Sequence, residues 1–407
     1  MTSEWNCTSF GKVCSHSAFG PRFSGDEYAV DGNVACLRTM DIDSHGRIDY
    51  DAMPLAKLDL ARLKSHILQP RDLVITRTGA YLGKVGLFEQ FRLPVLAGAF
   101  SIRFRINESA ADPIFLKYFF NGKQGQEGMH SIATGSAQPN LNIPRLHSLT
   151  IPCPPLPAQR AIASVLSSLD DKIDLLHRQN KTLEAMAETL FRQWFVEEAK
   201  DDWEVTTFAM HIDAYRGLSY KGSGLAEVGM GVPMHNLNSV FEGGGYKEAG
   251  IKYYSGDFKE RHIVRAGDVI VTNTEQGHEF RLIGFPAIVP HSFGDTGIFS
   301  QHIYRVVPKE KTYLTSEFLY YLMMVPEVRE QITSATNGST VNMLAIDGLQ
   351  RPTFRLPPNS KVTAFQKIAK DCRRKAELNH GSIRTLEKLR DNLLPKLMSG
   401  EVRVQYE

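Results

Sequence analysis

The stretch DKIDLLHRQNKTLEAMAETLF, residues 171–191, determines how this chain is interpreted because it occurs twice. Its second version is RKAELNHGSIRTLEKLRDNLL, residues 374–394, and the two align without a gap. His177 falls opposite His380, the triplet Thr-Leu-Glu recurs in the same place, and three charged positions change side chain but keep their sign. Two copies of one polar helical pattern, half a chain apart, indicate an internal duplication.

Both stretches lie in longer segments with the spacing of a coiled coil. Apolar residues recur at alternating steps of four and three from Leu169 in the first segment and approximately so from Phe365 in the second. Such a stripe buries one helix face against another helix. Asn180 and Asn379 place an amide on the stripe, which lowers stability but can fix the register. The residues expected to pair the helices are Leu169, Ile173, Leu176, Asn180, Leu183, Leu190, Ala376, Asn379, Ile383, Leu386 and Leu393.

The two helical segments carry opposite net charge. Residues 156–202 contain 6 Lys and Arg against 9 Asp and Glu, whereas residues 356–407 contain 11 against 6. Matching stripes and opposite charge predict that the helices pack against each other. A helix of about 40 residues is roughly 60 Å long. An antiparallel pair of this length would place two globular domains at opposite ends of a stiff rod.

The globular parts repeat as well. QPRDLVITRTGAYLGKVGLF, residues 69–88, is similar to RAGDVIVTNTEQGHEFRLIGF, residues 265–285, and both are predicted to form β-hairpins. Each long helix is preceded by a polar loop, an apolar stretch and prolines. The sequence therefore predicts a mixed α/β (α+β) fold with a pseudo-two-fold internal repeat. Its parts are a first globular domain at 1–155, a central helix at 156–200, a second globular domain at 201–356 and a C-terminal helix at 357–407.

Composition is that of an ordinary globular chain. Of 407 residues 42% are hydrophobic, and the formal net charge is only +2. The five cysteines form no C-x-x-C pair, which disfavours a disulfide framework or a zinc ribbon and fits a reducing compartment. The N-terminal residues lack an apolar signal core, and no window approaches about 20 apolar residues. We therefore expect a cytoplasmic protein that does not enter a membrane.

Motifs of common enzymes are missing from the sequence. There is no Walker A pattern, no G-x-G-x-x-G after a strand, no H-E-x-x-H and no G-x-S-x-G. The Asn-Pro-Pro-aromatic or Asp-Pro-Pro-aromatic tetrapeptide, which amino-methyltransferases place against a flipped base, is absent too. We expect no catalytic residue and no metal site in this chain.

Polar loops are the feature of the sequence that indicates a function. Arg, Lys, Gln and Asn read base edges, whereas Ser and Thr hold phosphates. Each loop alone is compatible with a solvated turn, but the loops recur at matching places in both copies, which favours a shared role. The candidate DNA-contacting residues are Arg77, Thr78, Tyr81, Lys84, Ser136, Gln138 and Asn140 in the first copy, and Arg216, Tyr220, Lys221, Asn273, Thr274, Gln276, His278, Arg281, Asn337, Ser339, Thr340 and Asn342 in the second.

These features resemble one known family over essentially the whole chain. The stretch IPCPPLPAQRAIASVLSSLDDKIDLLHRQNKTLEAMAETLFRQWF is similar to the central conserved region of the specificity (S) subunit of type I restriction–modification enzymes. LRDNLLPKLMSGEVRV resembles the distal conserved region of that family. RDLVITRTGAYLGKVG and GDVIVTNT look like core strands of its target recognition domains.

The resemblance implies a non-catalytic DNA-reading subunit. Each target recognition domain would read one half of a split target in double-stranded DNA, and the antiparallel helices would set the unread spacer. Two modification subunits would dock on the helices and supply adenine methyltransferase chemistry with S-adenosylmethionine. Restriction subunits, which combine motor and nuclease, would use ATP and Mg. No cofactor is expected in this chain itself.

Two other interpretations remain open at the level of sequence. A single-chain methyltransferase or nuclease with drifted motifs would bind S-adenosylmethionine on its own. A helical scaffold that pairs proteins without reading DNA would give no sequence-specific footprint.

Overall fold

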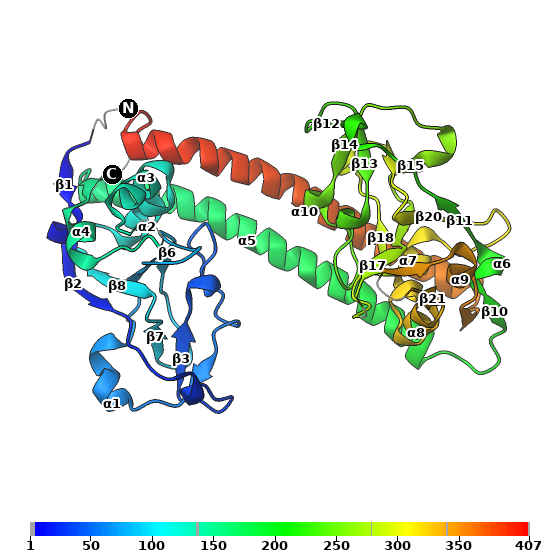
Figure 1. Ribbon diagram of the computed structural model, residues 1–407, viewed down its shortest axis with the longest axis horizontal. Coiled ribbons are helices and arrows are strands. Elements are labelled where there is room, and N and C mark those ends of the chain that lie inside the picture. Colours follow the sequence, from blue (N-terminus) through cyan, green and yellow to red (C-terminus); the bar gives the residue numbers. More distant parts are fainter. Residues whose placement is uncertain (1–4, 136–137, 278, 339–340, 406–407) are drawn as a thin grey trace. The chain divides into compact units, whose positions relative to one another are not determined.

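The computed structural model describes residues 5–135, 138–277, 279–338 and 341–405 of the chain (Figure 1). It divides into two compact units. Unit 1 contains residues 1–174 and 384–407, and unit 2 contains residues 175–383. Each of the two long helices contributes one part to each unit. Unit 1 is built from two segments that are distant in sequence, whereas unit 2 is one continuous segment.

Unit 1 contains three β-sheets. A four-stranded antiparallel sheet has the order β2 (Cys14–Phe19), β8 (Ser101–Ile106), β5 (Leu73–Thr76) and β6 (Val85–Leu87). A smaller sheet places β3 (Val34–Leu37) between β4 (Leu55–Ala56) and a parallel partner, β7 (Val95–Ala97). β1 (Cys7–Ser9) pairs with β9 (Thr150–Pro152), just before the first long helix.

Unit 2 repeats this topology. Its four-stranded sheet has the order β11 (Ile212–Arg216), β20 (Ile303–Pro308), β16 (Val269–Thr272) and β18 (Pro286–Ile288). The second sheet again contains a parallel pair, in the order β12 (Leu225–Ala226), β14 (Lys252–Tyr254), β13 (Val232–His235), β19 (Thr296–Phe299) and β15 (Ile263–Arg265). β10 (Val205–Thr207) pairs with β23 (Thr353–Arg355). The predicted internal repeat is confirmed at the level of strand order.

The short helices that follow β8 in unit 1 and β20 in unit 2 come in the same order, whereas the first short helix of each unit lies at a different place along the chain. Unit 1 has α1 (Leu60–Leu63), α2 (Pro113–Asn121), α3 (Lys123–Ile132) and α4 (Ile143–Ser148). Unit 2 has α6 (Phe208–His211), α7 (Ser316–Met324), α8 (Pro326–Ser334) and α9 (Ile346–Gln350). The start of α2 is fixed by Asp112, whose carboxylate accepts the amide hydrogens of Ile114 and Phe115 and so satisfies two otherwise unpaired donors.

The long helices are α5 (Leu156–Arg192), which continues as one π-helical stretch at Gln193–Glu197, and α10 (Asn359–Ser399). Both begin directly after a proline pair, and Gly400 with φ of +85° ends α10 in the left-handed conformation that favours glycine. Gln159, 1% exposed, fixes the start of α5: its amide donates to the Pro154 carbonyl and accepts the Asp112 amide hydrogen, both at 2.9 Å.

Alternating side chains bury one face of each four-stranded sheet. In unit 1, Leu73, Ile75 and Phe104 are fully buried and contact α2 and the first turns of α5 through one apolar cluster. In unit 2, the equivalent cluster joins Val269 and Val271 of β16 to α7 and to the aromatic side chains of the long helices. Burying one such side chain stabilises the fold by roughly 1.5–3 kcal/mol.

One predicted hairpin is confirmed and the other needs correction. In the first copy β5 pairs with β6 inside residues 69–88. In the second copy the partner of β16 is β18, which begins at Pro286, beyond the predicted segment. The residues between them form β17 (Thr274–Gln276), which pairs with β22 (Val341–Leu344) instead. β22 also pairs with β21 (Thr336–Asn337).

Candidate nucleic-acid interface

Two of the predicted polar loops meet in unit 1. Thr78 and Asn140 form an isolated antiparallel β-bridge, and the Arg77 carbonyl accepts the amide hydrogen of Leu141 at 2.8 Å. The Arg77 guanidinium donates to the Asn140 side-chain oxygen at 3.1 and 3.2 Å and lies 4.6 Å above the ring centre of Phe19. The two loops therefore meet at Arg77–Thr78 and Asn140–Leu141, with a planar cation held between an amide and an aromatic ring.

The equivalent loops meet in unit 2. There β17 and β22 pair so that Thr274 lies opposite Met343. Asn273 donates from its side chain to the Gln301 carbonyl at 3.0 Å, and its own carbonyl accepts the Leu344 amide hydrogen at 2.9 Å. Both copies thus bring the loop after the central strand against the loop that precedes the last short helix. Sequence reasoning placed these loops at matching positions, and the structure brings each pair together.

The candidate residues differ in exposure. Thr78, Asn273, Thr274 and Asn342 are buried. Thr78 and Asn342 bond across the paired loops, to the carbonyls of Pro139 and Gly277, whereas Asn273 and Thr274 bond to Gln301 and His302 in the turn before β20. Their role as DNA contacts stays a prediction, and in this structure their side chains bond within the protein. The exposed candidates are Tyr81, Gln138, Arg216, Lys221, Gln276, Arg281 and Asn337. Ser136, His278, Ser339 and Thr340 lie outside the described residues.

Two further candidates have internal partners. Lys84 donates to the Ile42 carbonyl at 2.8 Å and lies 4.3 Å from the ring centre of Tyr81, so it links the loop to the smaller sheet. Tyr220 accepts from Lys252 at 3.3 Å and its ring contacts Tyr254 edge-on, away from the paired loops. The segment 215–221 is therefore divided between two sheets. Tyr215 and Arg216 end β11 of the four-stranded sheet, where Arg216 lies opposite Tyr304, and Tyr220 packs against the five-stranded sheet.

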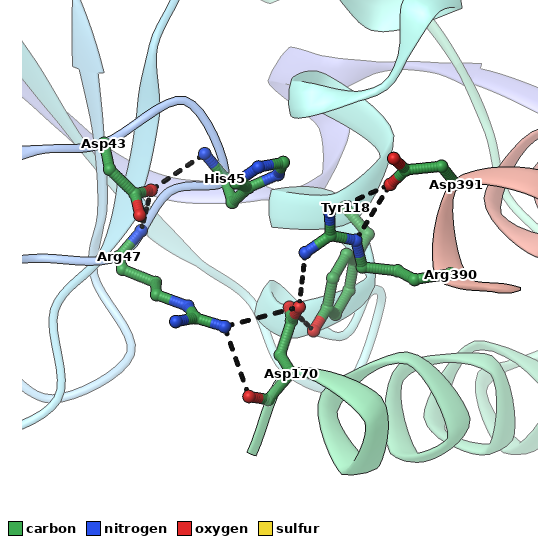
Figure 2. Close-up of polar contacts among 7 residues, drawn as sticks. All are labelled: Asp43, His45, Arg47, Tyr118, Asp170, Arg390 and Asp391. Carbon is green, nitrogen blue, oxygen red and sulfur yellow. Dashed lines mark hydrogen bonds and ion pairs between the residues drawn. The ribbon is translucent and has the colours of Figure 1, made fainter. Parts of the chain in front are cut away.

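In unit 1 the long helices are joined by a buried polar network (Figure 2). Arg390 of α10 donates to Asp170 of α5 at 2.9 Å, and the Tyr118 hydroxyl donates to the other carboxylate oxygen at 2.6 Å. Arg47 donates to the Asp170 backbone carbonyl at 3.2 Å. Burial alone would raise the pKa of Asp170, but the hydrogen bonds from Tyr118 and Arg390 outweigh it and hold the pKa below its ordinary value. This carboxylate stays ionised at neutral pH.

In unit 2 the same helices meet through amides and aromatic rings. Asn379, 2% exposed, donates to the Asn180 side-chain oxygen at 2.8 Å, and Phe191 packs edge-on against Phe365. As α5 runs from Asn180 to Phe191, its partner on α10 moves back from Asn379 to Phe365, so the helices are antiparallel in unit 2, as predicted. The predicted pairing residues are all buried or half-buried.

Charged side chains of α10 contact both α5 and the short helices. Asp170 and Arg390 form one ion pair across the helices of unit 1. In unit 2, Arg373 of α10 pairs with Glu317 of α7 and with Glu377 of its own helix, both at 2.9 Å. The basic side chains of α10 therefore also serve contacts with the short helices.

A cavity of about 660 Å³ lies along the helices in unit 2. Its wall combines apolar and aromatic side chains, including Phe241, Tyr320 and Tyr321, with Glu184 from α5 and His380 from α10. Burial, together with the neighbouring Glu188, raises the pKa of Glu184. The aromatic part of this wall is typical of protein-binding surfaces, in which Tyr and Phe are enriched.

Sequence reasoning missed several polar residues of unit 1. Asp72, Arg103 and Arg105 form a cluster on the face of the four-stranded sheet opposite the main core. The signal was present in SIRFRI, residues 101–106, where arginine alternates with Ile and Phe, because alternate residues of a strand point to opposite faces. Among the described residues no group of three metal-ligating side chains lies together, and no helix is long and apolar enough to cross a membrane.

Comparison with known proteins identifies relatives. Residues 2–185 match the family model described as type I restriction modification DNA specificity domain. The type I restriction enzyme MjaIX specificity subunit of Methanocaldococcus jannaschii is 25% identical over 312 residues, which is 72% of this chain and 69% of the relative. The MjaVIII specificity subunit of the same organism is 21% identical and covers 84% of this chain and 81% of its own length.

A solved structure has the same fold. The crystal structure of the type I restriction–modification S subunit from M. genitalium superposes with a TM-score of 0.64 at 14% identity. The superposition covers 97% of this chain and 96% of that one. The likeness therefore extends over both units and both long helices.

Proposed function

We propose that this chain, a relative of the type I restriction enzyme specificity subunits over most of its length, is the DNA sequence-recognition subunit of a type I restriction–modification complex. Each unit reads one half of a bipartite target in double-stranded DNA. The helices that join the units set the length of the unread spacer. The chain itself is not catalytic and needs no cofactor.

The observation that carries this proposal is the recurrence of one loop arrangement in both units. The loop after the central strand meets the loop before the last short helix at Thr78 and Asn140, and again at Thr274 and Met343. Two copies of one polar surface on one topology suit two separate half-sites. Their exposed Arg, Gln and Asn side chains are the types that read base edges in the major groove.

The long helices suit the docking of modification subunits, which would bring adenine methyltransferase chemistry and S-adenosylmethionine. The aromatic cavity beside Glu184 and His380 in unit 2 offers a protein-binding surface on these helices. Restriction subunits with ATP and Mg would complete the assembly. Two modification subunits per chain follow from the repeat, since each unit carries its own share of both helices.

A methylation profile of host DNA tests this function. Deleting the gene should abolish adenine methylation at one split motif and leave other motifs unchanged. Restoring the gene should restore that motif, and only that motif. If no motif changes, the chain is not a specificity subunit in that host. S-adenosylmethionine binding by the purified chain alone would favour a single-chain methyltransferase instead.

A further inference from the structure

A strongly basic pocket lies on unit 1, apart from the loops already described. Its volume is about 560 Å³, and four Arg or Lys side chains and one His line it. None of the described residues that line it is acidic. The basic and histidine side chains are His16 of β2, Arg62 and Lys64 at and after α1, and Arg103 and Arg105 of β8.

Arg103 is the unusual member of this group. It is 3% exposed, and its Nη2 donates to Nδ1 of His16 at 2.6 Å, which requires that this nitrogen carry no proton. Its Nε has no hydrogen-bond partner among the described residues. Burial, and then the charges of Arg103 and Arg105, lower the pKa of His16. The histidine thus accepts from the guanidinium without neutralising it.

The nearest carboxylate is already engaged. Asp72 accepts two hydrogen bonds from Arg105, each at 2.8 Å, and a third from the Gln69 amide at 2.8 Å. Arg103 approaches Asp72 only at 3.9 Å. One acidic and two arginine side chains leave one buried positive charge uncompensated, which is costly unless an anion joins them.

Unit 2 supplies an internal comparison. Arg103 lies between Ala18 and Val74 in the sheet, and Arg305 lies between Tyr215 and Ile270 in the matching register. Arg305 donates to Asp268 at 2.6 Å, so one acidic side chain pairs with one arginine.

The residues that correspond to Arg105 and His16 also differ in unit 2. Two residues further along the strand, unit 1 has Arg105 opposite His16, whereas unit 2 has Val307 opposite Asp213. The excess positive charge is therefore a property of unit 1 and not a requirement of the shared fold.

We propose that this pocket binds a backbone phosphate of the DNA that unit 1 reads, with Arg103 and Lys64 as the principal cations. A phosphate oxygen would accept from the Arg103 guanidinium, with exposed Lys64 beside it and Arg62, which pairs with exposed Asp59 at 3.2 Å, at the rim. The pocket adjoins the reading loops, since the Phe19 carbonyl contacts His66, next to the pocket wall, and the Phe19 ring lies under Arg77. This assignment rests on the proposed function.

The test compares two double variants of the full-length chain on a duplex of arbitrary sequence, since a phosphate contact does not depend on sequence. Arg62→Ala/Lys64→Ala removes two exposed cations from the pocket rim. Lys12→Ala/Lys123→Ala removes two exposed cations elsewhere on unit 1 and serves as the control. All four side chains are exposed, so both variants should fold. Binding is measured by fluorescence anisotropy between 50 and 200 mM salt, as is usual for such titrations.

The pocket variant should bind the duplex about eightfold more weakly at 0.1 M salt, and the slope of log K against log salt should fall by about 0.9, the value for one lost phosphate contact. The control should change the affinity by less than about twofold. Equal behaviour of the two variants, with a wild type that binds, would overturn the pocket and leave the proposed function standing. A wild type that binds no duplex even at the lowest salt, with its modification subunits present, would overturn both.

Inorganic phosphate separates a DNA site from a site for a free anion. Calorimetric titration of the wild-type chain with inorganic phosphate should show only weak binding, because a lone anion lacks the contacts that the rest of the duplex makes. Micromolar binding of inorganic phosphate that the Arg62→Ala/Lys64→Ala variant loses, with duplex binding unchanged, would overturn the assignment to DNA.

Discussion

Arg390 donates from Nη1 to the Asp170 carboxylate at 2.9 Å, and both side chains are more than nine-tenths buried. This pair joins α10 to α5 inside unit 1, across 220 residues of sequence. The Tyr118 hydroxyl occupies the other carboxylate oxygen, so the pair also joins both helices to α2 (Figure 2). A buried ion pair of this kind specifies register more clearly than it adds stability.

Asp170→Ala should destabilise unit 1 by about 3–5 kcal/mol, because it leaves the buried Arg390 guanidinium without its carboxylate. Replacing both partners, as Asp170→Leu/Arg390→Met, should recover most of that loss. Asp171→Ala, at the exposed neighbouring position, is the control and should cost less than about 0.5 kcal/mol. Denaturant unfolding of the full chain measures all three. A double variant no better than Asp170→Ala would show that the pair is not the origin of the effect.

The amide pair in unit 2 changes an expectation from the sequence. If the Asn180 amide had no partner on the apolar stripe, Asn180→Leu would keep or raise stability. The structure shows Asn180 accepting from buried Asn379 and donating to the Ala376 carbonyl at 3.4 Å. We therefore expect Asn180→Leu alone to cost about 1–3 kcal/mol, since a buried donor loses a partner.

The double variant Asn180→Leu/Asn379→Leu should return to wild-type stability or exceed it while the register loosens. Thermal unfolding gives the stability, and a disulfide introduced across α5 and α10 within unit 2 would report the register. A single variant as stable as the wild type would show that the hydrogen bond between the amides contributes nothing.

His235 predicts a pH dependence for unit 2. Burial lowers the pKa of His235 to about 4, and its Nδ1 lies 2.7 Å from the Tyr246 hydroxyl. The unfolded chain, with a His pKa of about 6.5, binds the proton more readily than the folded chain. The stability of unit 2 is therefore full above about pH 6.5 and falls as the pH drops toward 4, by about 3 kcal/mol in all.

Replacing this histidine separates its contribution from that of the other groups. His235→Gln should remove that part of the pH dependence, as followed by urea midpoints from pH 7 to 4. His45, an exposed histidine of unit 1, provides the control in a His45→Gln variant. An unchanged pH profile in His235→Gln would mean that other groups govern acid unfolding.

In unit 1, residues that read bases and residues that contact the phosphate backbone should respond differently to substitution. Changing Arg77 or exposed Gln138 should relax one position of the target by roughly 1–3 kcal/mol, the worth of a bidentate base contact. Changing Lys84 should instead weaken all sequences alike. Competition binding of the assembled complex on single-base variants of the target distinguishes these outcomes. A uniform loss for Arg77→Ala would assign that guanidinium to the phosphate backbone.

The chain alone should bind DNA weakly. By count, residues 1–155 carry 16 basic and 14 acidic side chains, and residues 203–355 carry 14 and 16. Phosphate contacts supply most non-specific affinity, and these charges provide few of them. Tight binding should therefore need the modification subunits, as a salt titration with and without them would show. Nanomolar specific binding by the isolated chain at physiological salt would contradict this.

The sequence predicted the elements that repeat and missed those that depend on distant partners. The apolar stripe predicted the buried positions of α5 and α10 because helix spacing is local. Asp170 lies beside the stripe position Leu169, whereas Arg390 occupies a stripe position where a charged residue gives no apolar signal. Only the folded chain shows that they meet. The loops were recognised by polarity, but polarity does not separate exposed Gln138 from buried Asn342, whose amide satisfies a backbone carbonyl of the neighbouring loop.

The prediction of the second hairpin was wrong for a related reason. Residues 274–276 alternate like a strand within a hairpin, yet they pair with β22, more than 60 residues away. A local pattern predicts that a segment is extended, whereas the choice of partner depends on the whole unit. The basic pocket could not be predicted from the sequence either, because its charge balance depends on which arginine forms the ion pair with Asp72.

Exchange of one globular domain tests the central claim, that the two units read their half-sites independently. Residues 1–150 would be replaced by the matching segment of a relative, and the methylation motif of a host carrying the chimera would be mapped by single-molecule sequencing. The account predicts that one half of the split motif changes while the other half and the spacer length stay the same. A chimera that folds and methylates DNA but changes both halves together would contradict it.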